Sequence, residues 1–181
     1  NGGDGKTGPI VLVEPADNIG GGAPGDGTHI LRAVLERGIE GAGAIIDDAA
    51  AVQALTSVEI GGTAKVAIGG HNGPLSGEPL QLEVTLLGRS DGDFDLEDEH
   101  SHLASMYGTR IHMGPCATVR CGGTTILLTS LKTPPFDLGQ WRSQGMAPEK
   151  LSVVIVKAAV AHRRAYDPIA RASFTVSTPV C

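Results

Sequence analysis

The chain has 181 residues, of which 14 are Lys or Arg and 20 are Asp or Glu, so its formal net charge is −6. This acidic balance argues against general nucleic-acid binding, because such proteins need a basic surface that neutralises phosphates. Hydrophobic residues make up 41% of the chain, which is enough for a core at this length. The longest apolar runs fall far short of the roughly 20 residues that cross a bilayer. We therefore expect a globular protein that binds neither nucleic acid nor membrane.

The chain contains three cysteines, Cys116, Cys121 and Cys181, which cannot all pair with one another. They form no Cys-x-x-Cys motif, so we expect a reduced, cytoplasmic compartment. The chain begins with Asn1 rather than Met and shows no signal peptide. We interpret it as a piece of a longer protein or as a processed chain.

The N-terminal part of the chain predicts strands and helices in alternation. Ile10–Val13 and Ala42–Ile46 are short apolar runs typical of buried strands. A glycine-rich loop from Asp17 to Gly27 follows the first of them. The order strand, helix, strand, helix is typical of a parallel crossover unit.

Capping residues mark the two helices of this unit. Thr28 is a candidate N-cap for the first helix, and Gly38 is expected to end it. Asp48 is expected to cap a second helix over Ala49–Ala54.

The rest of the chain predicts antiparallel strands and then a further strand–helix pair. The central strands are expected at Ala64–Ile68, Leu80–Leu87, Thr109–Met113, Ala117–Val119 and Thr124–Thr129. The C-terminal elements are expected as a helix over Asp137–Gln144, a strand over Leu151–Lys157, a helix over His162–Ala170 and an edge strand over Ser173–Ser177. The predicted fold is α/β to α+β, with a mixed sheet built from an N-terminal parallel βαβα unit, a central antiparallel region and a C-terminal βα unit.

The glycine-rich loop partly matches two phosphate-binding motifs. Gly20 to Gly25 has the G-x-G-x-x-G pattern between a strand and a helix, but the first glycine is too far from the strand, and Pro24 stiffens the loop. A P-loop would need Lys at the position of Thr28. A nucleotide- or phosphate-binding module that uses the Gly20–Gly27 loop stays an alternative, as does a loop without a ligand.

The acidic stretch from Asp91 to His102 invites a metal hypothesis, because carboxylates alternate there and a His-x-His motif follows. Its spacing does not fit a calcium loop, since Gly92 occupies the second position instead of the sixth. A solvated acidic loop is the favoured interpretation. Lys157, by contrast, ends a predicted parallel strand and should point to the same rim as the Asp17 loop.

Several segments, in order along the chain, resemble one protein family. The segment from Val11 to Thr28 is similar to the ADNPGGGAPGDGT segment that opens the C-terminal domain of MlrC-like proteins, the microcystinase-C type of metallopeptidase. Ile19 stands where the family has Pro. Later similarities are Asp47 with Ala51-Val52, Gly69-Gly70 with Gly77-Glu78-Pro79, Leu128-Thr129-Ser130, and Val156 to Ala170.

The resemblance implies that residues 1–181 form a single domain, while an N-terminal catalytic domain with the zinc ligands is absent from this chain. The chain would complete the active-site cleft of a zinc-dependent amidohydrolase or peptidase, with no catalytic residue, metal ligand or cofactor of its own. Its partners would be the N-terminal domain and a peptide or amide substrate, with homo-oligomerisation left open. A non-catalytic interaction domain stays an alternative.

The resemblance also places the substrate-binding residues on the glycine-rich loop and at the end of a late strand. Those expected to bind substrate are Asp17, Asn18, Gly20, Gly21, Gly22, Asp26, Thr28 and Lys157. The loop N–H groups, together with the ammonium of Lys157, would hold a substrate carboxylate.

Overall fold

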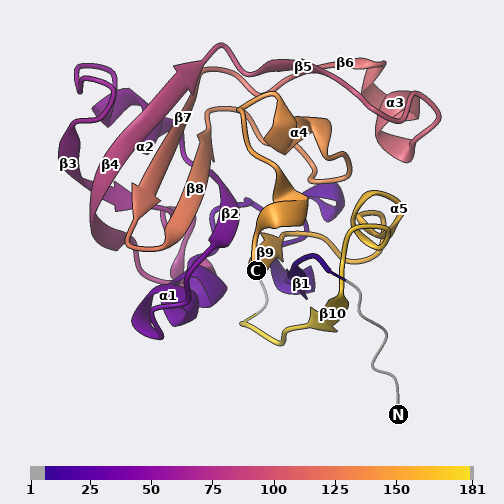
Figure 1. Cartoon of the computed structure of the whole chain (residues 1–181), viewed down its shortest axis with the longest axis horizontal. Helices are drawn as coiled ribbons and strands as arrows, with labels where there is room; N and C mark the ends of the chain where they lie inside the picture. Colours follow the sequence, from indigo (N-terminus) through magenta and orange to yellow (C-terminus); the bar gives the residue numbers. More distant parts are fainter. Residues whose placement is uncertain (1–6, 180–181) are drawn as a thin grey trace.

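A computed structural model describes residues 7–179 and shows an eight-stranded mixed sheet (Figure 1). Its strands, in spatial order, are β10 (Ala172–Thr175), β1 (Ile10–Val13), β9 (Val153–Val156), β2 (Ala42–Asp47), β8 (Thr124–Thr129), β7 (Cys116–Cys121), β4 (Leu80–Ser90) and β3 (Thr63–Ile68). The strands from β10 to β8 are parallel, whereas β7, β4 and β3 continue the sheet in antiparallel fashion. The predicted mixed sheet is confirmed.

The helices are short and lie on both faces of the sheet. They are α1 (His29–Glu36), α2 (Ala49–Ala54), α3 (His102–Tyr107), α4 (Gly139–Arg142) and α5 (Arg163–Tyr166), with 3₁₀ turns at Pro15–Asp17, Ile19–Gly21, Pro74–Ser76 and Pro148–Lys150. A separate two-stranded sheet pairs β5 (Asp93–Asp95) with β6 (Arg110–His112). In Figure 1, α1 lies below β2 and α2 lies behind β4 at the upper left, whereas α3, α4 and α5 lie toward the right.

Each face of the sheet buries its own hydrophobic cluster, because side chains alternate along the strands. In β9, Val153 and Ile155 pack in the cluster that contains residues of α1 and α2. Val154 and Val156 pack in the other cluster, with Trp141 of α4 and residues of α3 and α5. The parallel strands are therefore covered on both sides, as a continuous apolar run such as Val153–Val156 predicts.

The second cluster is organised around the one Trp of the chain. Trp141 is fully buried, and its indole Nε1–H donates to the hydroxyl of Tyr166 at 2.7 Å, so the polar atom is satisfied inside the core. Gly43 of β2 leaves space for the ring, since a Cβ there would lie 3.2 Å from it.

Most predicted elements are confirmed. Every expected strand is present, and Ser173–Ser177 corresponds to the edge strand β10. Asp48 caps α2 by accepting from the N–H of Ala51 at 2.8 Å, and Gly38 follows α1 with φ +59°.

Other expected elements differ from the structure in length or in the strand with which they pair. The helices expected over Asp137–Gln144 and His162–Ala170 are the four-residue helices α4 and α5, and β4 continues past Leu87 through a register shift. The strand expected at Thr109–Met113 is β6, which pairs with the unexpected β5 instead of joining the main sheet. Thr28 precedes α1, but its hydroxyl caps no helical N–H group.

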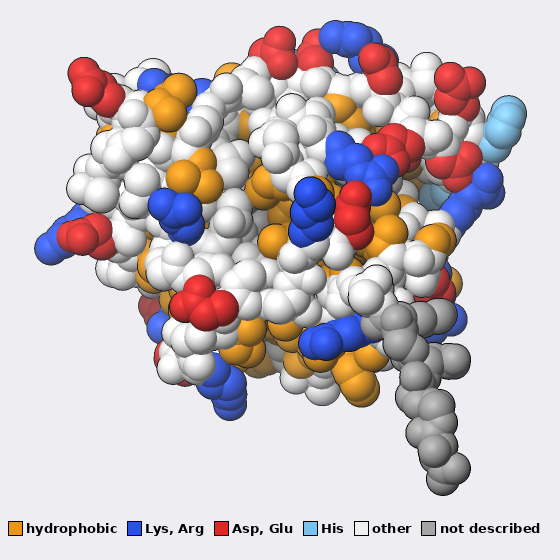
Figure 2. Space-filling view, viewed as in Figure 1, with side chains coloured by type: hydrophobic (Ala, Val, Ile, Leu, Met, Phe, Trp, Pro, Cys, Tyr) orange, Lys and Arg blue, Asp and Glu red, His pale blue; other side chains and the backbone are white. Residues whose placement is uncertain are grey.

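The surface carries mixed charge. On the face shown in Figure 2, acidic and basic side chains are interspersed instead of forming regions of one sign. Across residues 7–179, no helix is long and apolar enough to cross a membrane. Cys116 and Cys121 are free thiols, and Cys181 lies outside the described residues.

Candidate functional site

Polar side chains collect where the central parallel strands end. Glu14 follows β1, Lys157 follows β9, Asp47 ends β2 and Thr129 ends β8. Because these four strands are parallel neighbours, their carboxyl ends lie along one edge of the sheet. Such an edge is where open α/β sheets bind their ligands.

A buried ionic cluster lies at this edge. The ammonium Nζ of Lys157 lies 2.8 Å from Glu14 Oε2, from Asp17 Oδ2 and from the carbonyl oxygen of Gly27. The three charged side chains are each at most 2% exposed. Burial alone would lower the pKa of Lys157, but the charges of Glu14 and Asp17 outweigh it and raise the pKa above its ordinary value. Lys157 is therefore a charged group enclosed within the fold.

Asp17 holds the glycine-rich loop in shape from the inside. Its Oδ1 accepts from the N–H of Gly25 at 2.7 Å, and its Oδ2 accepts from the N–H of Gly27 at 2.8 Å. The N–H groups of Gly21, Gly22 and Ala23 donate to carbonyls of the preceding turn. These donors are occupied within the loop, so none of the five is free to hold a phosphate or a carboxylate.

Asp26 ties the same loop to the connection between β3 and β4. Its Oδ2 accepts from the backbone N–H groups of His71 and Asn72 at 2.8 and 3.0 Å, and from Asn72 Nδ2 at 2.9 Å. Burial would raise the pKa of Asp26, but the nearby Ser76 hydroxyl and the hydrogen bonds from Asn72 and His71 outweigh it and lower the pKa. The carboxylate is thus kept ionised as a link between two loops.

Thr28 and Asp48 strengthen this link. The Thr28 hydroxyl donates to the carbonyl of Glu78 at 3.0 Å and lies 3.2 Å from that of Ser76. Asp48 Oδ2 accepts from the N–H of Gly69 at 2.8 Å and lies 3.1 Å from His71 Nε2.

Between the two loops lies an open groove with a volume of about 570 Å³. Its walls are Pro15, Ala16, Asn18, Gly21, Gly22, Ala23 and Pro24 on one side, and Asn72, Pro74 and Leu75 on the other. All of these residues are uncharged. The groove combines apolar surface with two primary amides, which suits a neutral, partly apolar ligand.

The structure divides the sequence-predicted site residues into two sets. Asn18, Gly21 and Gly22 line the groove. Asp17, Asp26, Thr28 and Lys157 are buried behind it, at most 2% exposed. Gly20 lies under the ring of Phe136, where a Cβ would come within 2.5 Å of Cζ.

Three residues of this region escaped the sequence analysis as site residues. Asn72 and His71 lie in the turn that was predicted between two strands, and nothing in their local pattern indicates a contact with Asp26 about 45 residues earlier. Asp47 has a pKa raised to about 6 by burial, which a hydrogen bond from Thr129 and the charge of Lys132 only partly offset. The available signals were that Asp47 follows a predicted buried strand and that, with Ala51-Val52, it belongs to one of the segments similar to the family.

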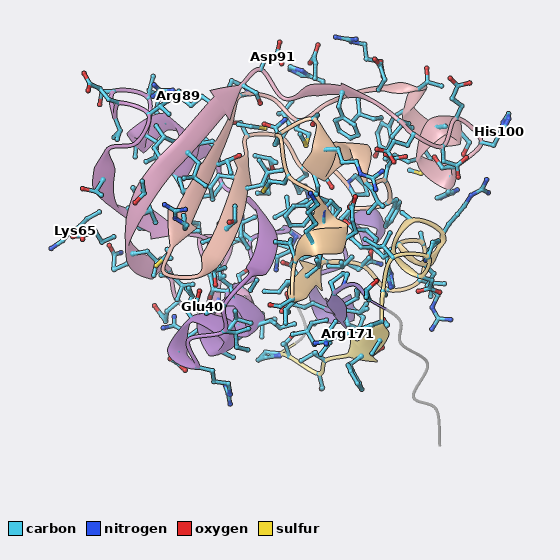
Figure 3. The ribbon with its side chains drawn as sticks, in the orientation of Figure 1. Glu40, Lys65, Arg89, Asp91, His100 and Arg171 are labelled. Carbon is cyan, nitrogen blue, oxygen red and sulfur yellow. The ribbon has the colours of Figure 1, made fainter. Side chains whose placement is uncertain are left out.

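The residues do not fit a metal site of their own. Within residues 7–179, no group of three or more His, Cys, Asp or Glu side chains is placed to hold a metal ion. In the acidic stretch, Asp93 pairs with Arg110 and Asp98 with Arg164, and Figure 3 shows Asp91 and His100 well apart.

Comparisons with known proteins agree with this architecture. The family model described as MlrC C-terminus matches residues 12–181. The protein named Microcystinase C from Sphingomonas sp. is 25% identical over 171 residues, which are 94% of this chain and 32% of that protein. The crystal structure titled "Putative metallopeptidase" from Mesorhizobium sp. BNC1 superposes with a TM-score of 0.81 at 24% identity, over 95% of this chain and 34% of that one. This chain spans about a third of the length of each relative.

Proposed function

Because the chain belongs to the MlrC C-terminal family, we propose that it is the substrate-binding domain of a metal-dependent amidohydrolase or peptidase. Residues 1–181 form one domain in this proposal, and an N-terminal domain outside the chain supplies the metal, expected to be zinc, with its ligands. The name of the Sphingomonas relative and its greater length support this division of roles. The cytoplasm is the proposed compartment.

The observation that carries the proposal is the groove at the carboxyl edge of the sheet. Two loops, which follow β1 and β3, form its walls, and buried carboxylates on Asp17 and Asp26 fix their shapes. Preformed walls reduce the ordering that a bound substrate must impose. In this role, Asn18, Gly21 and Gly22 contact the substrate, while the residues behind the groove position them.

In this proposal Lys157 holds the glycine-rich loop in position and does not contact the substrate. Its three acceptors already surround Nζ, so a substrate carboxylate would have to displace Glu14, Asp17 or the carbonyl of Gly27. We therefore assign Lys157 and Asp17 to positioning and not to substrate contact. The same occupied N–H groups disfavour the alternative of a phosphate-binding module.

The test measures bound zinc and amide hydrolysis for this chain alone and for the chain co-expressed with an N-terminal domain of the MlrC-like type. We expect hydrolysis and stoichiometric zinc only in the co-expressed complex. Stoichiometric zinc in the isolated chain would contradict the proposal. A co-purified complex that binds zinc but hydrolyses no amide or peptide would favour a non-catalytic interaction domain.

A further inference from the structure

The groove between the two loops has polar side chains of only one chemical type. Of its ten lining residues, Asn18 and Asn72 are the ones with a side chain that can form hydrogen bonds, and none is ionisable. We propose that this groove binds one uncharged peptide unit, recognised by the two asparagine amides, and not the charged terminus of a substrate. The inference rests on the proposed function and assigns the chemical group that this domain recognises.

The Oδ1 atom of Asn18 is buried without a hydrogen-bond partner among the described residues, so Nδ2 is the polar atom of this side chain that can reach a ligand in the groove. Its Oδ1 is buried beside Gly20, which lies outside the groove lining. Its Nδ2 lies over Gly21, where a Cβ would come within 2.9 Å of it, and Gly21 is part of the groove wall. Asn18 therefore offers an N–H donor to a ligand.

The amide of Asn72 has the opposite orientation, since its nitrogen is held by Asp26 and its oxygen is left for a ligand. Its Nδ2 donates to Asp26 Oδ2 at 2.9 Å, and its backbone N–H donates to the same oxygen at 3.0 Å. These two bonds to a buried carboxylate hold the side chain in place and use one of the two Nδ2 hydrogens. The Oδ1 of Asn72 is the atom left to accept a hydrogen bond from a ligand.

A donor on one wall and an acceptor on the other complement the two polar atoms of a peptide unit. The carbonyl of the ligand would accept from Asn18 Nδ2, and its N–H would donate to Asn72 Oδ1. The remaining wall residues include three prolines, two alanines and Leu75, which is 46% exposed and gives an apolar surface for the flanking side chains. A carboxylate has no N–H to donate to Asn72 Oδ1 and would place a negative charge near that oxygen, which disfavours a free terminus.

If the groove instead bound a substrate carboxylate, the positive charge beside this loop would be that of Lys132. Its Nζ lies 3.4 Å from the carbonyl of Ala23, on the loop that forms one wall, but Lys132 does not line the groove. It is also close enough to Asp47 for its charge to offset part of the rise that burial causes in the pKa of that carboxyl. A carboxylate-binding site at the rim would depend on Lys132, whereas the amide site depends on Asn18.

The experiment is an NMR titration of this chain with three tripeptides: acetyl-Ala-Leu-Ala-amide, the free acid acetyl-Ala-Leu-Ala, and the blocked peptide with its central amide nitrogens methylated. Each is titrated into the wild type and into the variants Asn18→Ala, Asn18→Asp and Lys132→Met. Gln53→Ala, an exposed change on α2, is the matched control. Native-like spectra of each variant are required before titration, and Asn18→Asp keeps the shape of the side chain if Asn18→Ala disturbs the loop.

We expect the blocked peptide to shift the side-chain amide signals of Asn18 and Asn72. Loss of one neutral hydrogen bond should weaken its binding about fivefold in Asn18→Ala, and the methylated peptide should bind more weakly by a similar factor. Lys132→Met and Gln53→Ala should bind as the wild type does. Tighter binding of the free acid that Lys132→Met abolishes would overturn the inference, as would blocked-peptide binding that no Asn18 variant changes, or the absence of any saturable binding. None of these outcomes alters the zinc and hydrolysis test, so the proposed function is judged separately.

Discussion

Replacing Lys157 with Met is expected to destabilise the chain by about 3–5 kcal/mol, because it leaves buried carboxylates without their cation. Lys157 Nζ lies 2.8 Å from both Glu14 and Asp17, and all three side chains are at most 2% exposed. Asp17 would still accept from the N–H groups of Gly25 and Gly27. Glu14 would lose the ammonium that accompanies its charge.

Urea and thermal unfolding at pH 7 measure this effect. In a chain of this length, about 4 kcal/mol corresponds to a fall in Tm of about 8–16 °C. Lys65→Met is the matched control, since Lys65 is exposed on β3 and points away from the molecule in Figure 3. It should change the unfolding free energy by less than about 0.5 kcal/mol.

A double-mutant cycle with Glu14→Gln tests the physical reason. Because Gln carries no charge, Lys157→Met should cost clearly less in the Glu14→Gln background than alone, with a coupling of about 1–3 kcal/mol. Purely additive effects, or a Lys157→Met cost as small as that of Lys65→Met, would refute the argument that enclosed opposite charges stabilise the loop. The raised pKa of Lys157 also fixes the sign of the pH dependence: this stabilisation is complete at neutral pH and is lost as the pH rises through the folded-state pKa.

Three further predictions follow from single positions. Asp47 should titrate at about pH 6 in a carbon-detected NMR experiment. Because folding raises its pKa, the free energy of unfolding should fall as the pH rises from about 4 to 6, and Asp47→Asn should make this fall smaller. Gly25→Ala should cost about 3 kcal/mol in urea unfolding, because φ is +82° and the new Cβ would lie 2.7 Å from Ile19 Cδ1, whereas Gly38→Ala, with open space around its Cβ, should cost about 1 kcal/mol. Burial raises the pKa of Cys116 to about 12, so iodoacetamide at pH 8 should leave this thiol unmodified in the native chain and alkylate it in urea.

The parts of the fold that sequence reasoning could predict are those with strong local signals. Val153–Val156 is a continuous apolar run that can be buried on both faces, and Asp48 before an alanine-rich segment is a direct capping signal. The strand β5 lacks such a signal, because Phe94 is its one buried residue between two aspartates. Helix α5 has only four residues, so its ends depend on tertiary contacts such as that of Tyr166 with Trp141.

The site was less predictable than the fold because its decisive contacts join distant positions. The sequence placed Asp17 and Lys157 at one edge of the sheet, and they do meet there. It could not show that the ammonium is turned inward, since that depends on Glu14 and on the path of the loop. The contact between Asp26 and Asn72 spans 46 residues and has no periodic signature.

The charged side chains of Asp17, Asp26 and Lys157 are buried and hold the loops, whereas the groove between the loops is lined by uncharged residues. A loop rich in glycine loses much conformational entropy when it is ordered, and charge-assisted hydrogen bonds from Asp17 and Asp26 offset that loss where solvent cannot compete. Under the proposed function, a change at Asp17 or Lys157 would therefore reduce hydrolysis in the complex by loosening the walls, without either residue touching substrate. Such a loss should be accompanied by a lower Tm, whereas a loss caused by Asn18→Ala, which introduces no charge, should leave Tm within a few degrees of the wild type. Measured together, stability and activity separate the residues that build the groove from those that recognise what it binds.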